Sequence, residues 1–181
     1  STTGKNNKHR VIEITDILGS TFSVNMSVQS MDDNVLKNIN RSNISLEDYK
    51  GVNEHLSRKG RSGNGEVIIG LPGENKNTFL LGLEKLLDAG VTNITIYTLM
   101  LLHGTEFQDP EYRKKYKIMG KFRIVPLNFS SLNGKKIIDY EEVGIQTKDM
   151  SFKDYIEIRG ISVLVEILHN ARPFEEFFYL T

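Results

Sequence analysis

Polar and glycine residues follow the ends of three predicted strands, and these residues are the groups in the sequence that could do chemistry. Because the carboxyl ends of parallel strands meet at one edge of a sheet, we expect them to form a single ligand-binding rim. The first strand end supplies Ser27, Gln29 and Ser30, the second supplies Glu66, Gly70, Leu71, Pro72, Gly73 and Glu74, and the third supplies Tyr97, His103, Gly104 and Thr105.

The Gly70 to Glu74 segment cannot continue a regular strand, because it holds two glycines and a proline. Its backbone N–H groups are free, and a ligand could approach its main chain closely, as in loops that cradle nucleotides. A tight strand-to-helix turn explains the same residues equally well. Glu66 opens an otherwise apolar strand, so its carboxylate either faces solvent or binds a ligand.

Other polar side chains near the strand ends have both a binding and a structural interpretation. Gln29 both donates and accepts hydrogen bonds, which suits ribose hydroxyls or an amide, and Arg41 could hold a carboxylate. Both residues also fit a plain surface position. His103 has no second histidine or acid beside it in the sequence, so a structural role is favoured over metal binding or acid–base chemistry. Tyr97 is expected to lie half in the core and half on the rim.

A basic segment is the one nucleic-acid-like patch in the sequence. It runs from Glu111 to Lys117 and continues to Lys121 and Arg123, with tyrosines between the basic residues. At zero net charge a solvated helix face explains it better, and nucleic acid is not expected as a partner. The sequence has no Gly-x-Ser-x-Gly elbow, no His-Glu-x-x-His and no phosphate loop ending in Gly-Lys-Ser/Thr.

Composition places the chain among ordinary globular domains. It has 181 residues, 39% hydrophobic, and its 23 basic and 23 acidic side chains cancel. No apolar run approaches the roughly 20 residues that a membrane span needs, and Ser1 to Arg10 does not resemble a secretory signal, so we expect a cytoplasmic protein. The absence of cysteine excludes disulfides, thiolate zinc sites and a cysteine-ligated iron–sulfur cluster within this chain.

Helical and strand patterns alternate through the first part of the chain, which predicts an α/β fold with parallel βα units. Ser45 and Asp48 resemble a capping box, and Gly60 to Gly65 is expected to be a polar turn. The expected helices cover 10–18, a short segment around 35–39, 45–56 and 78–89, and the expected strands cover 22–28, 66–69 and 91–99.

Beyond Gly104 the pattern changes. Asp109-Pro110 predicts the start of a charged helix, and two β-rich segments on either side of Asn133-Gly134 predict an antiparallel hairpin. These segments are Phe122 to Pro126 and Ile137 to Tyr140. A long helix is expected from 151 to 170, before Pro173.

Several motifs, taken in order, resemble the second half of the radical S-adenosylmethionine (radical SAM) enzymes. The resemblance covers about Arg10 to Thr105, and it is closest to members that carry a cobalamin-binding domain ahead of the barrel. The segments that carry it are Val24-Asn-Met-Ser-Val-Gln-Ser30, Asn34-Val-Leu-Lys-Asn-Ile-Asn-Arg41, Val67-Ile-Ile-Gly-Leu-Pro-Gly-Glu74, Ile96-Tyr-Thr-Leu99 and Gly104-Thr105.

The resemblance implies that S-adenosylmethionine lies across the carboxyl ends of a partial (β/α)6 barrel, where a [4Fe–4S] cluster cleaves it reductively. It places Gln29 at the ribose, Arg41 at the methionine carboxylate and Glu66 at the sugar or amine. Ser27 is expected to be a further cofactor-binding residue. The Gly70 to Glu74 turn then packs beside adenine, and Tyr97 flanks it. The substrate is expected to be a small molecule of unknown identity, and cobalamin is a possible further cofactor.

The chain departs from that family because it lacks the Cys-x3-Cys-x2-Cys loop and the strands before the opening helix. The resemblance therefore implies the C-terminal half of a barrel over 1–106, with an extension over 107–181 in the same structural unit, from a truncated enzyme that is inactive alone. Unpaired strands near Phe22 and at the opposite edge predict self-association. The alternatives are a cysteine-free, non-catalytic module that binds a nucleotide or a partner protein and, least favoured, an RNA-binding protein that uses residues 111–123.

Overall fold

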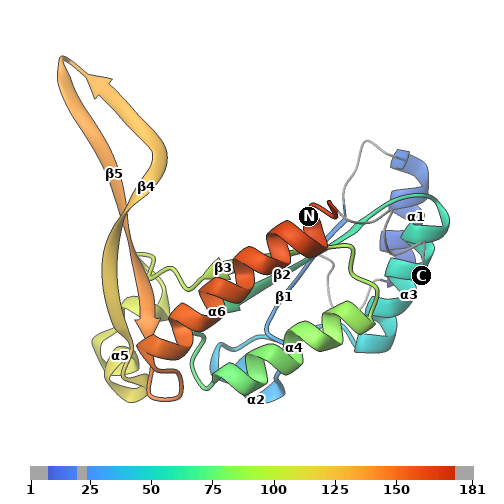
Figure 1. The fold of residues 1–181 in the computed structure, drawn as a ribbon, viewed down its shortest axis with the longest axis horizontal. Helices are drawn as coiled ribbons and strands as arrows, with labels where there is room; N and C mark the ends of the chain where they lie inside the picture. Colours follow the sequence, from blue (N-terminus) through green and yellow to red (C-terminus); the bar gives the residue numbers. More distant parts are fainter. Residues whose placement is uncertain (1–7, 20–23, 174–181) are drawn as a thin grey trace.

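The computed structural model describes residues 8–19 and 24–173 and has an α/β architecture with a hairpin that projects from it (Figure 1). Each expected helix and strand is present, with boundaries that differ by a few residues. In chain order the elements are α1 (Lys8–Leu18), β1 (Val24–Gln29), α2 (Asp33–Asn38), α3 (Leu46–Arg58), β2 (Gly63–Ile69), α4 (Lys76–Asp88), β3 (Asn93–Thr98), the 3-10 turn η2 (Glu106–Gln108), α5 (Pro110–Tyr116), β4 (Met119–Leu132), β5 (Lys135–Gln146), α6 (Phe152–Leu164) and η3 (Val165–Asn170).

The first sheet has the strand order β1-β2-β3, and both pairs of neighbours are parallel. This arrangement confirms the predicted α/β fold of parallel βα units. Figure 1 shows the helices α3, α4 and α6 on the same side of the sheet. The expected start of the first strand, Phe22, lies outside the described residues.

Local signals explain where the helices begin. Ser45 accepts a hydrogen bond from the Asp48 backbone N–H (3.0 Å) at the start of α3. Asn75, one residue before α4, forms a capping box with Thr78, and Ser151 forms one with Asp154 before α6. These side chains satisfy N–H groups that have no partner within their own helix.

The expected polar turn over 60–65 is wrong at its C-terminal end, because β2 already begins at Gly63. Gly63 and Gly65 face the helices, and there the backbone passes close to buried side chains. A Cβ on Gly63 would lie 2.0 Å from Asn53 Oδ1, and one on Gly65 would lie 2.9 Å from Tyr49 Oη. The glycines are therefore required by packing, although their composition is typical of a turn.

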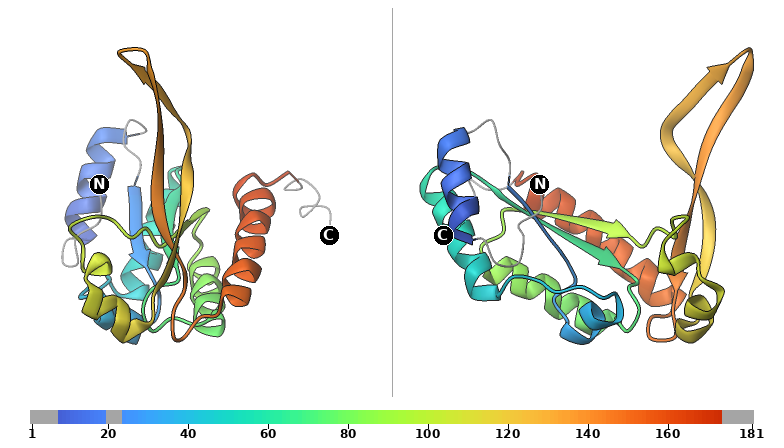
Figure 2. Two further views of the ribbon diagram at one scale, coloured as in Figure 1. Left: turned by 90° about the vertical axis from the view of Figure 1, so that its left-hand side faces the viewer. Right: turned by 180° about the vertical axis from the view of Figure 1, so that it is seen from behind.

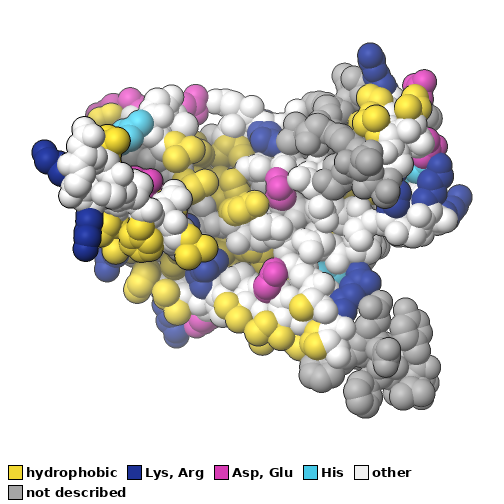
Figure 3. Space-filling model, turned by 90° about the horizontal axis from the view of Figure 1, so that it is seen from above, with side chains coloured by type: hydrophobic (Ala, Val, Ile, Leu, Met, Phe, Trp, Pro, Cys, Tyr) yellow, Lys and Arg dark blue, Asp and Glu magenta, His cyan; other side chains and the backbone are white. Residues whose placement is uncertain are grey.

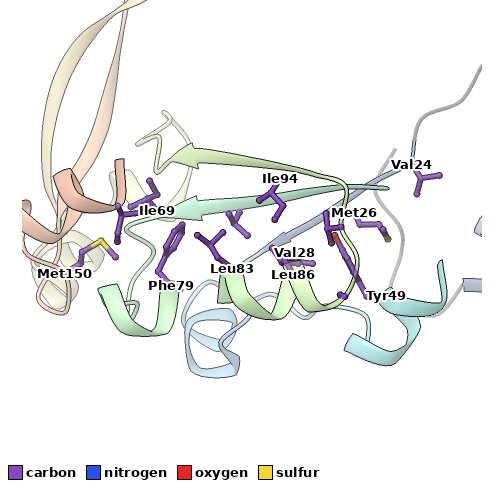
Figure 4. Close-up of a cluster of buried hydrophobic side chains, with 14 of the residues drawn as sticks. Val24, Met26, Val28, Tyr49, Ile69, Phe79, Leu83, Leu86, Ile94 and Met150 are labelled. Atoms are coloured by element: carbon purple, nitrogen blue, oxygen red, sulfur yellow. The ribbon is translucent and has the colours of Figure 1, made fainter. Parts of the chain in front are cut away.

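The main core lies between the sheet and the helices that cover it (Figure 4). Ile69 and Leu86 are fully buried there, and Ile158 of α6 joins the same cluster. A second cluster contains Val35, Leu71, Leu99, Leu101, Tyr116 and Ile118. This cluster joins residues from both sides of position 106, so the extension packs against the sheet region; the boundary at 106 itself stays a prediction.

The expected hairpin is present and is longer than its sequence signal. β4 and β5 pair antiparallel, and the turn uses left-handed φ angles at Asn133 (51°) and Gly134 (75°). We call residues 119–146 the arm; Figure 2 shows it extending away from the sheet and helices. The register shifts between Ile124 and Phe129, which bends the arm in its middle.

The two edges of the parallel sheet differ. The side-chain amide of Asn170 bonds to both the backbone N–H and the C=O of Ile94, each at 2.9 Å, so it covers the β3 edge at this point. Beyond β3, the foot of the arm pairs with the chain through Leu101 N to Glu142 O (2.9 Å) and Gly144 N to Leu99 O (2.8 Å). Among the described residues β1 pairs with β2 alone, so the free edge expected on both sides is found mainly on one.

Candidate functional site

The face of the sheet opposite the helices carries mostly polar side chains. Alternate residues on each strand point to this face, and the parallel register aligns them in rows across the three strands. Figure 3 shows a hollow here between the arm and α1, with hydrophobic side chains gathered toward the arm. The polar residues are Asn25 and Ser27 on β1, Asn64 and Glu66 on β2, and Thr95 and Tyr97 on β3.

Ser27 links two of the predicted site residues. Its hydroxyl donates to a carboxylate oxygen of Glu66 on the neighbouring strand. Its backbone carbonyl accepts a hydrogen bond from Arg41 Nη2 at 2.9 Å. The structure therefore brings a carboxylate and a guanidinium together at the end of β1, and each group keeps further hydrogen-bonding capacity.

Gln29 ends β1 in a left-handed conformation, with φ of 63°. The register between β1 and β2 shifts between Ser27 and Gln29, so the strand is irregular at this point. A non-glycine residue with positive φ is uncommon and often lies at a functional site. Gln29 is half-buried beside Val67 of β2, which keeps it near the rim.

The Gly70 to Glu74 segment is a tight, buried turn. Gly70 and Gly73 have φ of 85° and 92°, and the side chains of Leu71 and Pro72 are buried. Asn38 Nδ2 donates to the Pro72 carbonyl at 3.0 Å, and a Cβ on Gly73 would lie 2.4 Å from that same nitrogen. Only the backbone of this turn can therefore contact a ligand, and its contact with adenine stays a prediction.

Glu74 packs between the ends of β1 and β2. Its Oε1 accepts a hydrogen bond from Ser30 Oγ at 2.8 Å, its side chain is 1% exposed, and its Oε2 has no partner among the described residues. Burial raises the pKa of this carboxyl to about 8, helped by the nearby charge of Asp32 and opposed by hydrogen bonds from Ser30 and the Gly70 backbone. Glu74 is therefore mostly protonated at neutral pH and ties the end of β1 to the end of β2.

The third strand end contributes less than expected. Tyr97 is 45% exposed on the open face, as a residue between core and rim should be. The next loop turns on itself, with Thr105 Oγ1 donating to the Leu102 carbonyl at 2.6 Å and Gly104 at φ of 81°. His103 is exposed, and within the described part of the chain no group of three or more His, Asp or Glu could hold a metal ion.

Three polar residues of the open face were not predicted as site residues: Asn25, Asn64 and Thr95. Asn64 Nδ2 donates to Asn25 Oδ1 at 2.8 Å, one row below Ser27 and Glu66. The signal was present in the sequence, because Asn25, Ser27 and Gln29 alternate with apolar residues. That alternation predicts one polar face along the strand.

Two curated proteins match nearly the whole chain. The sequence is 31% identical over 177 residues to 2-(S-pantetheinyl)-carbapenam-3-carboxylate methyltransferase of Streptantibioticus cattleyicolor. It is 29% identical over 177 residues to the cobalamin-dependent radical SAM methyltransferase TokK of Streptomyces tokunonensis. Each alignment covers 92% of this chain. The chain is related in sequence to a radical SAM enzyme.

The match to TokK supports the expected similarity to cobalamin-dependent members of the radical SAM enzymes. The chain spans about a quarter of the length of these two relatives, 25% in each case. An uncharacterized protein of Methanocaldococcus jannaschii is 24% identical over 109 residues, covering 60% of this chain and 34% of that protein. No family model matches the sequence.

One solved radical SAM structure aligns with part of the chain. Coproporphyrinogen III oxidase (HemN) of Escherichia coli superposes with a TM-score of 0.42 and 21% identity, covering 48% of this chain and 20% of that one. A TM-score of this size is too low to define a shared fold. The relation to radical SAM enzymes therefore rests on the sequence match to TokK.

The open face fits one radical SAM cofactor and lacks ligands for the other. S-adenosylmethionine carries an amine, a carboxylate and ribose hydroxyls, which match the Glu66 carboxylate, the Arg41 guanidinium and the hydrogen-bonding side chains around them. An iron–sulfur cluster needs cysteine thiolates, and this chain has none. The residues of this chain therefore do not hold a cluster.

The basic segment from 111 to 123 is used within the fold. Tyr112 Oη donates to the Asn38 carbonyl at 2.8 Å, and Tyr116 Oη donates to Asn38 Oδ1 at 3.1 Å, so the two rings pack inward. The expectation that this segment does not bind nucleic acid stays a prediction. No helix in the described ranges is long and apolar enough to cross a membrane, and the cytoplasmic location stays a prediction.

Proposed function

We propose that this chain is the C-terminal, cofactor-binding half of the barrel of a cobalamin-dependent radical SAM methyltransferase. Two relatives that align over 92% of the chain are named methyltransferases, and one of them is named as cobalamin-dependent. The observation that carries the proposal is the polar open face, where Ser27 bonds both Glu66 and Arg41. Parallel sheets normally have both faces covered, so an uncovered polar face is suited to a bound cofactor.

The residues of the chain would bind and orient S-adenosylmethionine. Arg41 holds the methionine carboxylate, Glu66 accepts from the amine or a ribose hydroxyl, and Gln29 bonds the ribose. Ser27 fixes the positions of Glu66 and Arg41 through hydrogen bonds. When bound and reduced by a [4Fe–4S] cluster, S-adenosylmethionine supplies the radical chemistry of the family.

The turn from Gly70 to Glu74 would support the adenine through its backbone, with Tyr97 beside it. Burial of Leu71 and Glu74 leaves their side chains to packing. Glu74 then acts as a positioning residue, because it joins the ends of the two strands that carry Ser27 and Glu66. The chain has no cysteine, so we expect it to be inactive without a cluster-binding half.

The first test is to sequence the gene upstream of the codon for Ser1. Radical SAM members of this kind carry Cys-x3-Cys-x2-Cys on an early strand loop, so the coding sequence upstream of Ser1 should encode this motif. An upstream reading frame without it would contradict the catalytic proposal and leave a nucleotide- or partner-binding module.

The second test measures cofactor affinity in the protein as its gene encodes it. Arg41→Ala and Glu66→Ala should each weaken S-adenosylmethionine binding about tenfold or more, because each removes a charged hydrogen-bond partner. Arg58→Ala is the matched control, because Arg58 is an exposed α3 residue that pairs with Glu54 of its own helix. If calorimetric titration gave the same affinity for S-adenosylmethionine in all three variants, Arg41 and Glu66 would not be cofactor-binding residues.

A further inference from the structure

A cavity lies at the foot of the arm, outside the polar face of the sheet. Its volume is about 370 Å³, within the range of small-molecule sites. One wall is the loop after β3, with Leu101, Leu102 and His103, and the opposite wall is the arm, with Phe122 and Tyr140. The cavity therefore adjoins the carboxyl end of the sheet, where ligands of α/β proteins gather.

The acidic residues of this cavity are neutralised by arginines. Arg113 Nη2 bonds Glu142 Oε1 at 2.7 Å and Arg113 Nη1 bonds Glu142 Oε2 at 3.2 Å; this hydrogen-bonded arginine holds the pKa of Glu142 below its usual value. Arg123 pairs with Glu141 at 2.6 Å. Because each carboxylate already has a cation, the cavity presents little net charge to a ligand.

The apolar part of the lining continues up one side of the arm. The register pairs Ile124 with Tyr140 and Phe129 with Ile138, so these side chains share a face with Phe122. The Phe122 and Tyr140 rings meet edge to face at 5.7 Å. The five side chains are 52–71% exposed, a continuous apolar stripe that begins in the cavity.

Two polar groups of the cavity have unused capacity. The His103 ring and the Tyr140 hydroxyl line the cavity and have no hydrogen-bond partner among the described residues. An imidazole and a phenol can together donate and accept bonds from an amide or hydroxyl. The chemistry of the lining therefore selects a ligand that is uncharged, mainly apolar, and carries a few such groups.

We propose that this cavity and the apolar stripe bind an extended, uncharged amphipathic chain, such as an alkyl amide, that forms part of the substrate. The ligand's chemistry is inferred from the cavity alone, and only its role as a substrate rests on the proposed function. The stripe gives the chain a surface to lie along, while Tyr140 and His103 bond its amide near the sheet. The polar face of the sheet is left free for the cofactor.

The experiment compares three probes of similar length on the whole chain: N-hexylacetamide, hexanoate and hexylammonium. Ligand-observed NMR titration should show saturable binding of the amide, with both charged probes weaker by about tenfold because their charge must be desolvated. Equal binding of all three probes, or no saturable binding of the amide, would overturn the proposal.

Variants locate the binding. Tyr140→Ser and Leu102→Asn should each weaken N-hexylacetamide binding at least about fivefold, since each removes apolar wall. Leu102 lies outside the hairpin, so its variant remains informative if Tyr140→Ser disturbs strand pairing. Ile137→Ser is the matched control, because Ile137 pairs with Ser130 on the other face of the arm. An equal loss in all three variants would contradict the assignment.

The same samples separate this proposal from the proposed function. Calorimetric titration of the Tyr140→Ser and Leu102→Asn proteins, as their gene encodes them, should give unchanged affinity for S-adenosylmethionine. If the protein bound the amide but not S-adenosylmethionine, the proposed ligand site in the cavity would stand and the cofactor proposal would be wrong. If it bound S-adenosylmethionine but not the amide, the cofactor proposal would stand and the ligand site would be wrong.

Discussion

The parallel sheet and the arm are both paired β-structure, but they bury their side chains very differently. The sheet carries α3, α4 and α6 on one face, and Ile69 and Ile94 there are 0% and 1% exposed. In the arm, β4 and β5 are the longest strands, yet Phe129 is 63% exposed and Leu127 is 91% exposed. Backbone pairing is similar in the two regions, so the difference arises from what covers the strands.

The two regions therefore have different roles: one provides folding free energy and the other provides exposed surface. A two-stranded hairpin has little stability of its own, and burial against helices supplies most of the folding free energy. The sheet region therefore holds the molecule together and positions the polar face. The arm contributes surface at its outer part, and its foot is fixed by contacts to Leu99 and Leu101.

Matched truncations in the two regions should show the largest contrast. Ile69→Ala removes fully buried methyl groups and should lower the free energy of unfolding by about 3 kcal/mol. Phe129→Ala, on the exposed arm, should change it by less than about 0.5 kcal/mol. Urea unfolding followed by circular dichroism measures both, and a similar loss in the two variants would mean that the arm is covered in solution.

Two glycine substitutions sharpen the role of close packing in the sheet region. Gly63→Ala places a Cβ against Asn53 and should destabilise the protein by roughly 2 kcal/mol. A Cβ on Gly160 in α6 would have no heavy atom of the described residues within 4 Å, so Gly160→Ala should stabilise the protein by up to about 1 kcal/mol. Thermal unfolding of the pair tests this, and two changes of the same sign would contradict the packing argument.

Glu74 gives the sheet region a dependence on pH that the arm should lack. Its folded pKa is about 8 against a usual 4.5, so the folded state holds a proton that the unfolded state releases between these values. Stability from this group is fully present below pH 4.5 and falls by about 1.4 kcal/mol per pH unit until pH 8.

Glu74→Gln keeps a neutral side chain at every pH and should remove this part of the slope. Chemical unfolding at several pH values from 5 to 9 measures the effect. Above pH 8 the variant should be more stable than the wild type, and parallel profiles for the two proteins would contradict the buried, protonated state.

Two arginines test where the arm is anchored, with the smallest expected effects. Arg113→Met leaves the half-buried Glu142 poorly paired at the foot and should cost about 1 kcal/mol. Arg123→Met removes the more exposed pair with Glu141 and should cost less than about 0.5 kcal/mol. Unfolding in low and high salt compares them, and the reverse order would place the anchor higher on the arm.

Sequence patterns located the strand ends well, because turn and capping residues act locally. The turn that begins at Gly70, the Asn133-Gly134 turn and the helix start at Asp109-Pro110 all lie where they were expected. The start of β2 was missed, because glycine in a strand has the same composition as glycine in a turn. Only the approach of Asn53 shows why Gly63 belongs to the strand.

The candidate site was predicted in part. Ser27, Arg41 and Glu66 were singled out by residue type, and their direct contacts join positions up to 39 residues apart. Burial of Glu74 and Leu71 was not visible, because an acid and a leucine in a glycine turn have the same local signal whether they face a ligand or the core. Their suggested contacts with a cofactor therefore stay predictions.

The sequence by itself determined the order of helices and strands, the parallel sheet and the relation to radical SAM enzymes, because periodicity, turn chemistry and motif order are properties of neighbouring residues. The tertiary structure decided which of those residues meet: Ser27 with Glu66 and Arg41, and Ser30 with Glu74. It also decided that a stripe of the arm continues into a cavity. These outcomes depend on strand register and on packing between distant segments, which no local pattern encodes.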